Sequence, residues 1–492
     1  MSTARFLSLA PLQIAQALIG FGAIAAFTRL MSAEEFGRYA LALSISMAAH
    51  TLIFTWAEAA AFRFFAAARA EKRLADHFAT LVVLALALGG AVLVVTAAIL
   101  SFAGLRDDIA ALSLFAAGAA VFRFITKLGR ESDRAALAFG RYAALETTYL
   151  LLGFAVAVAL LTLFDFGAAA PFAGLLAAGG LVALIDAPRL LANARGGAIS
   201  VKRTMTYGGY GAPLALALAV DLGVQAVART VLATEAGAAE IGAYAAAFGL
   251  ARGLDVIFIG VSAAFAPLVF AAYEENGAEA ARHAACNGFV LLAAITMPAT
   301  TGLVLIAEPM TALMVGQELR AATALAAPWL ALAALMTGFS LYYWSEAFQL
   351  TRRTGLRALL MLAPGAVQLA LTAWLAREHG APGAAIAAAA GATLGALLLA
   401  FAGRRLLSLP FPLAEVCRIL AGVALMSLAV KLVEAPPTAL GLMQLVLTGA
   451  LSYGAAVIAF DVLGLRTTAL AAAQRATRRF TLQTNTSAVN AD

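Results

Sequence analysis

Residues 78–105 read FATLVVLALALGGAVLVVTAAILSFAGL, a long run without a single charged side chain. A helix of about 20 apolar residues crosses the hydrocarbon core of a bilayer, which is about 30 Å thick. Within that core the backbone hydrogen-bonding groups must be satisfied inside the protein, and a helix achieves this. The stretch therefore predicts a transmembrane helix.

The rest of the chain has the same character. Of its 492 residues, 63% are hydrophobic and 12% are charged, whereas an ordinary soluble domain has about 25% charged residues. Uncharged runs bounded by charges or Gly/Pro turns recur throughout. They predict an all-α polytopic membrane protein with about fourteen spans, at 6–28, 39–57, 78–105, 108–128, 142–164, 166–185, 204–232, 240–273, 284–307, 321–345, 358–376, 380–403, 413–434 and 435–460. Charges enter the fourth and thirteenth runs, so the boundaries of these two are the least defined.

Lys and Arg residues are concentrated in alternate loops. With the N-terminus inside the cell, twenty-five of the 33 fall in cytoplasmic segments, seven fall on the opposite side, and Arg252 lies within the eighth span. Cytoplasmic loops of membrane proteins carry an excess of Lys and Arg. The pattern therefore predicts a multi-pass protein with both termini in the cytoplasm.

Several function classes are excluded by what the sequence contains. Its two cysteines, Cys286 and Cys417, and four histidines form no disulfide framework or metal cluster. The loops are too short for an extramembrane catalytic domain of a glycosyltransferase or polymerase, and no GxxxxGK[ST] phosphate loop occurs. We expect neither an enzyme nor a nucleic-acid-binding protein, and no cofactor.

A short sequence recurs after the first and seventh spans. Phe36-Gly37-Arg38-Tyr39-Ala40 follows the first, and Ile241-Gly242-Ala243-Tyr244-Ala245 follows the seventh. Transporters are often built from repeated halves. The recurrence indicates either a parallel duplication of six helices followed by two added ones, or a common loop-to-helix turn that arose twice by chance.

The stretch FTRLMSAEEFGRYALALS (27–44), with a basic segment after the second span, resembles the polysaccharide transport family of Wzx-like oligosaccharide flippases. This family belongs to the multidrug/oligosaccharidyl-lipid/polysaccharide (MOP) superfamily. The resemblance implies two six-helix lobes, 1–203 and 204–405, around a central cavity. It also implies that helices 13 and 14, at 406–465, pack outside, and a basic tail at 466–492 follows them.

The resemblance also implies a function. Such proteins move polyprenyl-diphosphate-linked oligosaccharides from the cytoplasmic to the periplasmic leaflet of the bacterial inner membrane by alternating access. Transport is commonly coupled to a proton or sodium gradient and serves surface polysaccharide biosynthesis. The protein would work either alone or beside a polymerase or assembly machinery. The alternative within the superfamily is a drug/cation antiporter of the MATE type. A mid-membrane arginine and two extra spans favour an anionic lipid substrate.

Arg252 and Asp255 are the strongest candidates for substrate binding. They lie about twelve and fifteen residues from the outer end of the eighth span, so at about 1.5 Å per residue they are about 18 and 22 Å deep. Charges inside spans are costly and usually face a bundle interior or a cavity. Arg252 would bind the diphosphate and Asp255 would tune or release it; the alternative is a self-neutralising pair on one helix.

The remaining candidates lie in the first, second and seventh spans. Asp221, a lone acid near the middle of the seventh, is the first choice for ion coupling, with a helix–helix hydrogen bond as the alternative. Glu58, the second candidate for ion coupling, and Arg63, a candidate for substrate binding, could flank a cytoplasmic entrance, although such residues are more often positive-inside anchors. Arg29 and Arg229 end the first and seventh spans, either at the cavity mouth or as interfacial anchors.

Glycines and a proline cluster at the start of the seventh span, between 207 and 213. Such residues bend helices and let them approach closely. A hinge here would suit rocking between inward and outward states. The sequence therefore predicts that Gly209→Leu depresses transport and leaves membrane insertion intact.

Overall fold

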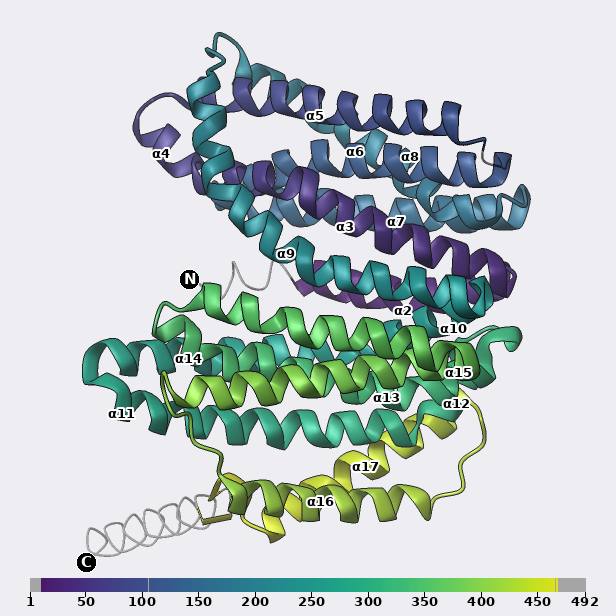
Figure 1. The fold of residues 1–492 in the computed structure, drawn as a ribbon, viewed down its shortest axis with the longest axis vertical. Coiled ribbons are helices and arrows are strands. Elements are labelled where there is room, and N and C mark those ends of the chain that lie inside the picture. Colours follow the sequence, from purple (N-terminus) through teal and green to yellow (C-terminus); the bar gives the residue numbers. More distant parts are fainter. Residues whose placement is uncertain (1–9, 105, 465, 468–492) are drawn as a thin grey trace, which may run out of the picture. The chain divides into compact units, whose positions relative to one another are not determined.

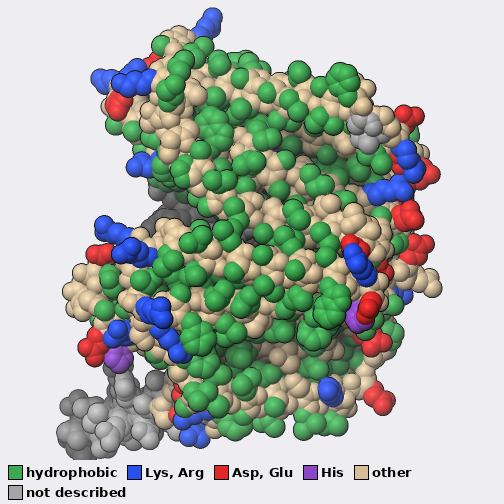
Figure 2. Space-filling view, in the orientation of Figure 1, with side chains coloured by type: hydrophobic (Ala, Val, Ile, Leu, Met, Phe, Trp, Pro, Cys, Tyr) green, Lys and Arg blue, Asp and Glu red, His purple; other side chains and the backbone are tan. Residues whose placement is uncertain are grey.

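A computed structural model of the chain describes residues 10–104, 106–464 and 466–467. Every regular element within these ranges is a helix (Figure 1). Hydrophobic side chains cover the length of the helices in Figure 2, and most charged side chains lie near helix ends. This is the arrangement of a polytopic membrane protein, as the sequence predicted.

The chain divides into two compact units, which we describe separately. Unit 1 comprises Met1–Gly249, Met314–Ala326 and Gln368–Ala387, and unit 2 comprises Leu250–Leu313, Ala327–Val367 and Ala388–Asp492. The earlier helices are α2 (Ala10–Leu30), α3 (Ala33–Arg63), α4 (Phe65–Ala70), α5 (Leu74–Ala103), α6 (Asp107–Ala135), α7 (Phe139–Leu163), η1 (Gly167–Ala169), α8 (Ala170–Ala194), α9 (Val201–Ala236) and α10 (Ala238–Ala251). The later ones are α11 (Gly253–Leu305), α12 (Ala307–Met314), η2 (Gln317–Leu319), α13 (Arg320–Phe339), η3 (Ser340–Trp344), α14 (Ser345–Leu350), α15 (Thr354–Arg404), α16 (Leu413–Lys431), α17 (Ala439–Ala459) and η4 (Val462–Gly464).

Eleven helical stretches in the described residues are long and apolar enough to cross a membrane. Two of them, Ala238–Leu305 and α15, each cover two predicted spans. The chain changes direction within them at Gly277 (φ 80°) and Gly380 (φ 54°), left-handed conformations that glycine adopts at little cost. With the shorter apolar helix α2, all fourteen predicted spans correspond to helix. The two spans with poorly defined boundaries are the complete helices α6 and α16.

The turn between α2 and α3, within the stretch 27–44, is fixed by local contacts. Ser32 caps α3, with its Oγ 3.3 Å from the amide of Glu35 and the Glu35 carboxylate 3.0 Å from the amide of Ser32. This reciprocal pair satisfies two backbone donors that would otherwise have no partner. The capping box therefore defines where the second span begins.

Unit 1 contains α9 and the start of α10, which open the predicted second lobe. In unit 2, α16 and α17 pack on α11, and the hydroxyl of Tyr453 donates to the carbonyl of Ala294 at 2.8 Å. The lobe boundaries 1–203, 204–405 and 406–465 stay a prediction. Of the predicted tail 466–492, only Arg466 and Thr467 lie within the described residues.

Helix α9 packs along α3 through close backbone approach. A Cβ at Gly211 would collide with the backbone of Trp56, whereas a Cβ at Gly209 would meet nothing within 4 Å. One turn before Gly211 in α9, Tyr207 stacks on Phe64, with ring centroids 5.0 Å apart. Helix α9 is continuous through this region. The hinge suggested by the glycines therefore stays a prediction. Of Gly209 and Gly211, only Gly211 is required to be glycine by the packing of α9 on α3.

We expect Gly211→Leu to destabilise the folded protein by about 1–3 kcal/mol, the usual effect of overpacking a close contact. Gly209→Leu is the matched control, because its side chain enters open space. The measurement is the thermal unfolding midpoint of each purified variant. Equal midpoints for the two variants would show that the α3–α9 contact is looser than the structure indicates.

Candidate functional site

Arg252 lies at the break between α10 and α11, fourteen residues after Ala238. That is about 21 Å along a helix, deep enough to reach the middle of the hydrocarbon core. Its Nε lies 3.8 Å from Oδ2 of Asp255, and the two side chains are 61% and 48% exposed. The structure thus brings these two predicted residues together as a loose pair and leaves the guanidinium accessible.

Two aromatic side chains of unit 2 pack beneath this pair, and the first of them, Phe258, is fully buried. Phe258, one turn beyond Asp255, stacks on Tyr342 with ring centroids 5.9 Å apart and an interplanar angle of 15°. Tyr342 is close enough to Asp255 for the two groups to interact electrostatically. A guanidinium of the kind that binds phosphate oxygens in a bidentate manner therefore lies beside a carboxylate, on a helix whose next turn is anchored in the core by Phe258.

Glu58 is buried between α3 and α6, with its side chain 3% exposed. Its Oε1 lies 2.8 Å from Nε2 of His50, and its Oε2 accepts from Nζ of Lys127 at 2.7 Å. A buried carboxylate needs such partners, because an unpaired charge in an apolar medium is costly. The sequence singled out Glu58 for ion coupling, and the structure adds a histidine and a lysine in direct contact.

A second buried ionic cluster joins α6, α7 and α8, and the sequence analysis missed it. Asp186 is bound by Arg141 at 2.6 Å and by Arg189 at 2.8 Å. Arg189 also binds Asp133 at 2.6 Å, and both aspartates are almost fully buried. Removing one partner of such a pair typically costs 3–5 kcal/mol. The sequence did contain a signal for this cluster, because Asp133 and Asp186 lie among basic residues. Those basic residues were interpreted only as indicators of membrane topology.

The α2–α3 turn contacts the start of α10 and the segment before α13. Nη1 of Arg29 donates to the carbonyl of Met314 at 3.0 Å, and Thr28 Oγ1 accepts from the amide of Gly316 at 2.9 Å. The amide of Ala33 donates to Glu318 at 3.0 Å. We call this set of contacts the outer contact cluster, because the predicted orientation of the chain would put it on the side opposite the cytoplasm.

The two glycines of the recurring sequence meet in the same place. A Cβ at Gly37 would collide with the carbonyl of Ala238, and one at Gly242 would approach the carbonyl of Ala33. The recurrence therefore marks a point at which α3 and α10 pack backbone to backbone. The contact explains why both positions are glycine, whether or not a duplication produced them.

The two other predicted arginines contact aromatic rings in unit 1. Arg229 donates to the hydroxyl of Ser44, and its guanidinium lies 4.9 Å from the ring centroid of Phe248. Arg63 is exposed, and its guanidinium lies 6.0 Å from the ring centroid of Tyr210. Arg229 is therefore held between α3 and α10, and Arg63 lies at the end of α3. Both arginines belong to unit 1, whereas Arg252 belongs to unit 2.

The structure describes the side-chain surroundings of Glu346 but not those of Asp221. Asp221 lies in α9, and its side chain is outside the part of the chain that the structure describes. Glu346 in α14 is 3% exposed, and neither of its oxygens has a hydrogen-bond partner among the described residues. A π-helical turn, η3, directly precedes it. Within the described ranges no group of three or more His, Cys, Asp or Glu side chains could hold a metal ion.

Comparison with known proteins identifies a family. The model of the family described as "Polysaccharide biosynthesis protein" matches residues 26–377. No curated protein matches the chain.

Solved structures with the same fold are similar over most of the chain. One is the lipid II flippase MurJ in an inward closed conformation, with 15% identity and a TM-score of 0.72 over 92% of this chain and 98% of that one. Another is an inward-facing multidrug resistance MATE family transporter of the MOP superfamily, with 18% identity and a TM-score of 0.64 over 80% of this chain and 94% of that one. An outward-facing MATE transporter has 16% identity and a TM-score of 0.56 over 82% and 94%. At these identities the likeness shows a shared fold.

Proposed function

The chain belongs to the polysaccharide biosynthesis protein family, and from that premise we propose that it flips a polyprenyl-diphosphate-linked oligosaccharide across the membrane. The head group cannot cross hydrocarbon unaided, because each unsatisfied polar group there costs several kcal/mol. The protein would supply a hydrated path for the diphosphate and sugars, and the polyprenyl tail would stay in lipid. No covalent bond is made or broken in this process, so no catalytic residue is needed.

The observation that carries the proposal is Arg252. A guanidinium that is 61% exposed at mid-span is tolerated in a membrane when it faces water or an anionic ligand. Arginine stays charged and forms bidentate bonds to phosphate. Asp255, 3.8 Å away, would compete with the diphosphate for the guanidinium and so favour release.

Alternating access requires contacts at one end of the protein to open while those at the other end close. The outer contact cluster joins the predicted lobes 1–203 and 204–405 through Arg29, Glu318 and the pair Gly37 and Gly242. We propose that it is the gate that opens toward the periplasm. This assignment rests on the positive-inside orientation, which places both termini in the cytoplasm of a bacterium and the cluster on the opposite side of the inner membrane.

Deletion of the gene followed by analysis of polyprenyl-linked intermediates tests the function. We expect surface polysaccharide to be lost and lipid-linked oligosaccharide to build up in the cytoplasmic leaflet, with recovery on re-expression. A polymerase or assembly machinery that uses the flipped substrate would then lack its supply. Unchanged polymer with new sensitivity to cationic dyes would instead favour a drug antiporter of the MATE type.

We propose that Glu58 couples transport to protons. His50 and Lys127 are the ionisable groups in contact with it, and proton uptake by Glu58 would release Lys127 and loosen the α3–α6 contact. Glu58→Gln is expected to abolish stimulation of flipping by a proton gradient in proteoliposomes, while exchange without a gradient continues. Glu131→Gln is the control, because Glu131 is paired with Arg134 on the same helix. Stimulation that survives in Glu58→Gln, or that follows sodium, would contradict proton coupling here.

A further inference from the structure

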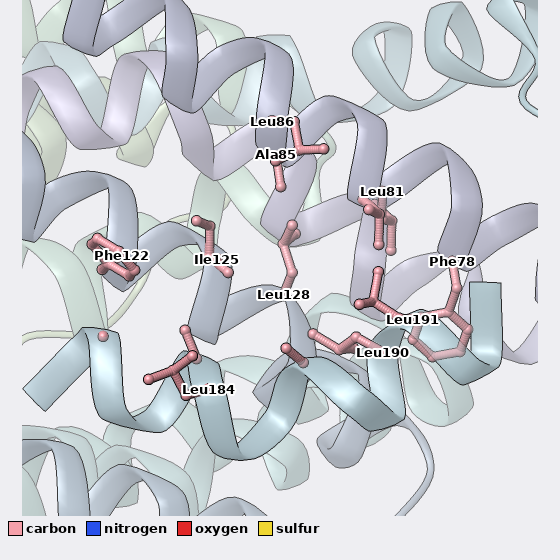
Figure 3. Close-up of a pocket in the computed structure, with 14 residues that line it drawn as sticks. Phe78, Leu81, Ala85, Leu86, Phe122, Ile125, Leu128, Leu184, Leu190 and Leu191 are labelled. Carbon is pink, nitrogen blue, oxygen red and sulfur yellow. The ribbon is translucent and has the colours of Figure 1, made fainter. Parts of the chain in front are cut away.

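An apolar groove runs between α5, α6 and α8 of unit 1, with a cavity volume of about 250 Å³ (Figure 3). Every side chain that lines it is hydrophobic. Phe78 and Leu81 come from α5, Phe122 and Leu128 from α6, and Leu191 from α8. The groove plays no part in the transport path proposed above.

Small residues on α8 create the groove. Gly180, Ala183 and Ala187 line it at spacings of three and four residues, so they share one face of the helix. Their side chains are too short to fill the space between α5 and α6. Larger side chains form the margins, where Leu86 is 68% exposed and Leu184 is 73% exposed.

These exposed leucines lie within predicted spans, so the groove opens to the hydrocarbon of the bilayer. A gap next to lipid is filled by lipid chains, because an empty space loses dispersion contacts with its lining. An apolar wall does not distinguish one lipid from another, since their tails are alike. Any preference must come from the end of the groove that lies at head-group level.

That end is strongly basic. The loop after α8 is held on the first turn of α5, where the amide of Ala198 donates to Asp76 at 2.8 Å. Arg73 and Arg203 also bind Asp76. Arg195 and Lys72 are exposed and form no ion pair with a described residue. The segments 71–76 and 195–203, at the junctions of α4 with α5 and of α8 with α9, together contain two acids, Glu71 and Asp76, and five cations, Lys72, Arg73, Arg195, Lys202 and Arg203.

We propose that this groove binds one acyl chain of an anionic phospholipid, with the lipid phosphate at Arg195 and Lys72. Basic pockets between transmembrane helices on the cytoplasmic side favour such head groups. The phospholipid fits better than the lipid-linked substrate, because the groove has no polar lining for sugars. A phospholipid head can also stay at the basic end, whereas the substrate's head must leave to cross the membrane.

The test is native mass spectrometry of the purified full chain, released from bilayers that contain phosphatidylethanolamine and phosphatidylglycerol, with undecaprenyl phosphate added in a second set. The wild type is expected to retain phosphatidylglycerol in preference. Arg195→Ala and Lys72→Ala should each weaken retention roughly fivefold, from about 1 kcal/mol per cation near the surface. The double variant Arg353→Ala/Arg405→Ala is the matched control, since it removes two exposed cations far along the chain from the groove.

A second variant tests the groove itself. Ala183→Phe fills the cavity and keeps every basic residue, so it should release the bound phosphatidylglycerol without lowering the unfolding midpoint. Equal retention of the two lipids by the wild type would overturn the proposal. So would an equal loss in the Arg353/Arg405 control, or stronger retention of undecaprenyl phosphate than of phosphatidylglycerol, which would assign the groove to the substrate.

Discussion

Arg252→Ala is expected to slow flipping of lipid-linked oligosaccharide roughly 10- to 100-fold, because a hydrogen bond to a charged group contributes about 1.5–3 kcal/mol. The side chain is accessible and only loosely paired with Asp255, so its loss leaves no buried charge without a partner. Folding should therefore be preserved. The measurement is the flipping rate of a fluorescent lipid-linked oligosaccharide in proteoliposomes.

Two substitutions sharpen this prediction. Arg252→Lys keeps the charge but loses the planar fork that holds phosphate at two points, so its rate should fall between those of wild type and alanine. Arg418→Ala should leave the rate unchanged, because Arg418 pairs with Glu415 near the start of α16. If Arg252→Ala flips the substrate at the wild-type rate, Arg252 does not take part in the mechanism.

Cross-linking the outer contact cluster is expected to stop transport completely. With Cys286 and Cys417 replaced by serine, Ala33→Cys and Glu318→Cys place thiols on the two sides of the proposed gate, where the Ala33 amide and the Glu318 carboxylate are 3.0 Å apart. A short reagent that joins both thiols would prevent the gate from opening, and a cleavable reagent would make the block reversible. Flipping before and after cleavage is the measurement.

Each single-cysteine variant, treated with the same reagent, serves as the control for modification alone. Recovery after cleavage separates a gate from a folding defect, because a misfolded protein would not regain activity. Normal flipping by the cross-linked protein would mean that α3 and the segment before α13 need not separate during transport.

The transmembrane helices were predictable from the sequence because the bilayer imposes a minimum length and excludes charge. Residues 78–105 became α5, and even the poorly defined fourth and thirteenth runs became α6 and α16. The turn at Gly277 falls between the predicted spans 240–273 and 284–307, although the residues on either side of it are helical. The polar run EENGAEAARH (274–283) marked the connection, and a single glycine with positive φ redirects the chain within it.

The side-chain clusters were less predictable. Arg252 and Asp255 could be paired, because residues three apart on one helix are neighbours. The contact of Glu58 with Lys127 crosses from α3 to α6, and the Asp186 cluster crosses three helices. The length of a hydrophobic run determines where a span lies in the sequence, but it does not determine which helices pack against that span. The contact of His50 with Glu58 spans eight residues of α3, and only the structure shows that the two side chains meet.

Reaction of Arg252→Cys with a membrane-impermeant, water-soluble thiol reagent, in the background without native cysteines, tests the central claim most directly. If position 252 faces an aqueous path, this cysteine reacts, as one at the exposed position 195 should, whereas one at the lipid-facing position 184 stays unmodified. A cysteine at 252 as unreactive as one at 184 would place the arginine against lipid or within packed protein, and the flipping mechanism proposed here would be wrong.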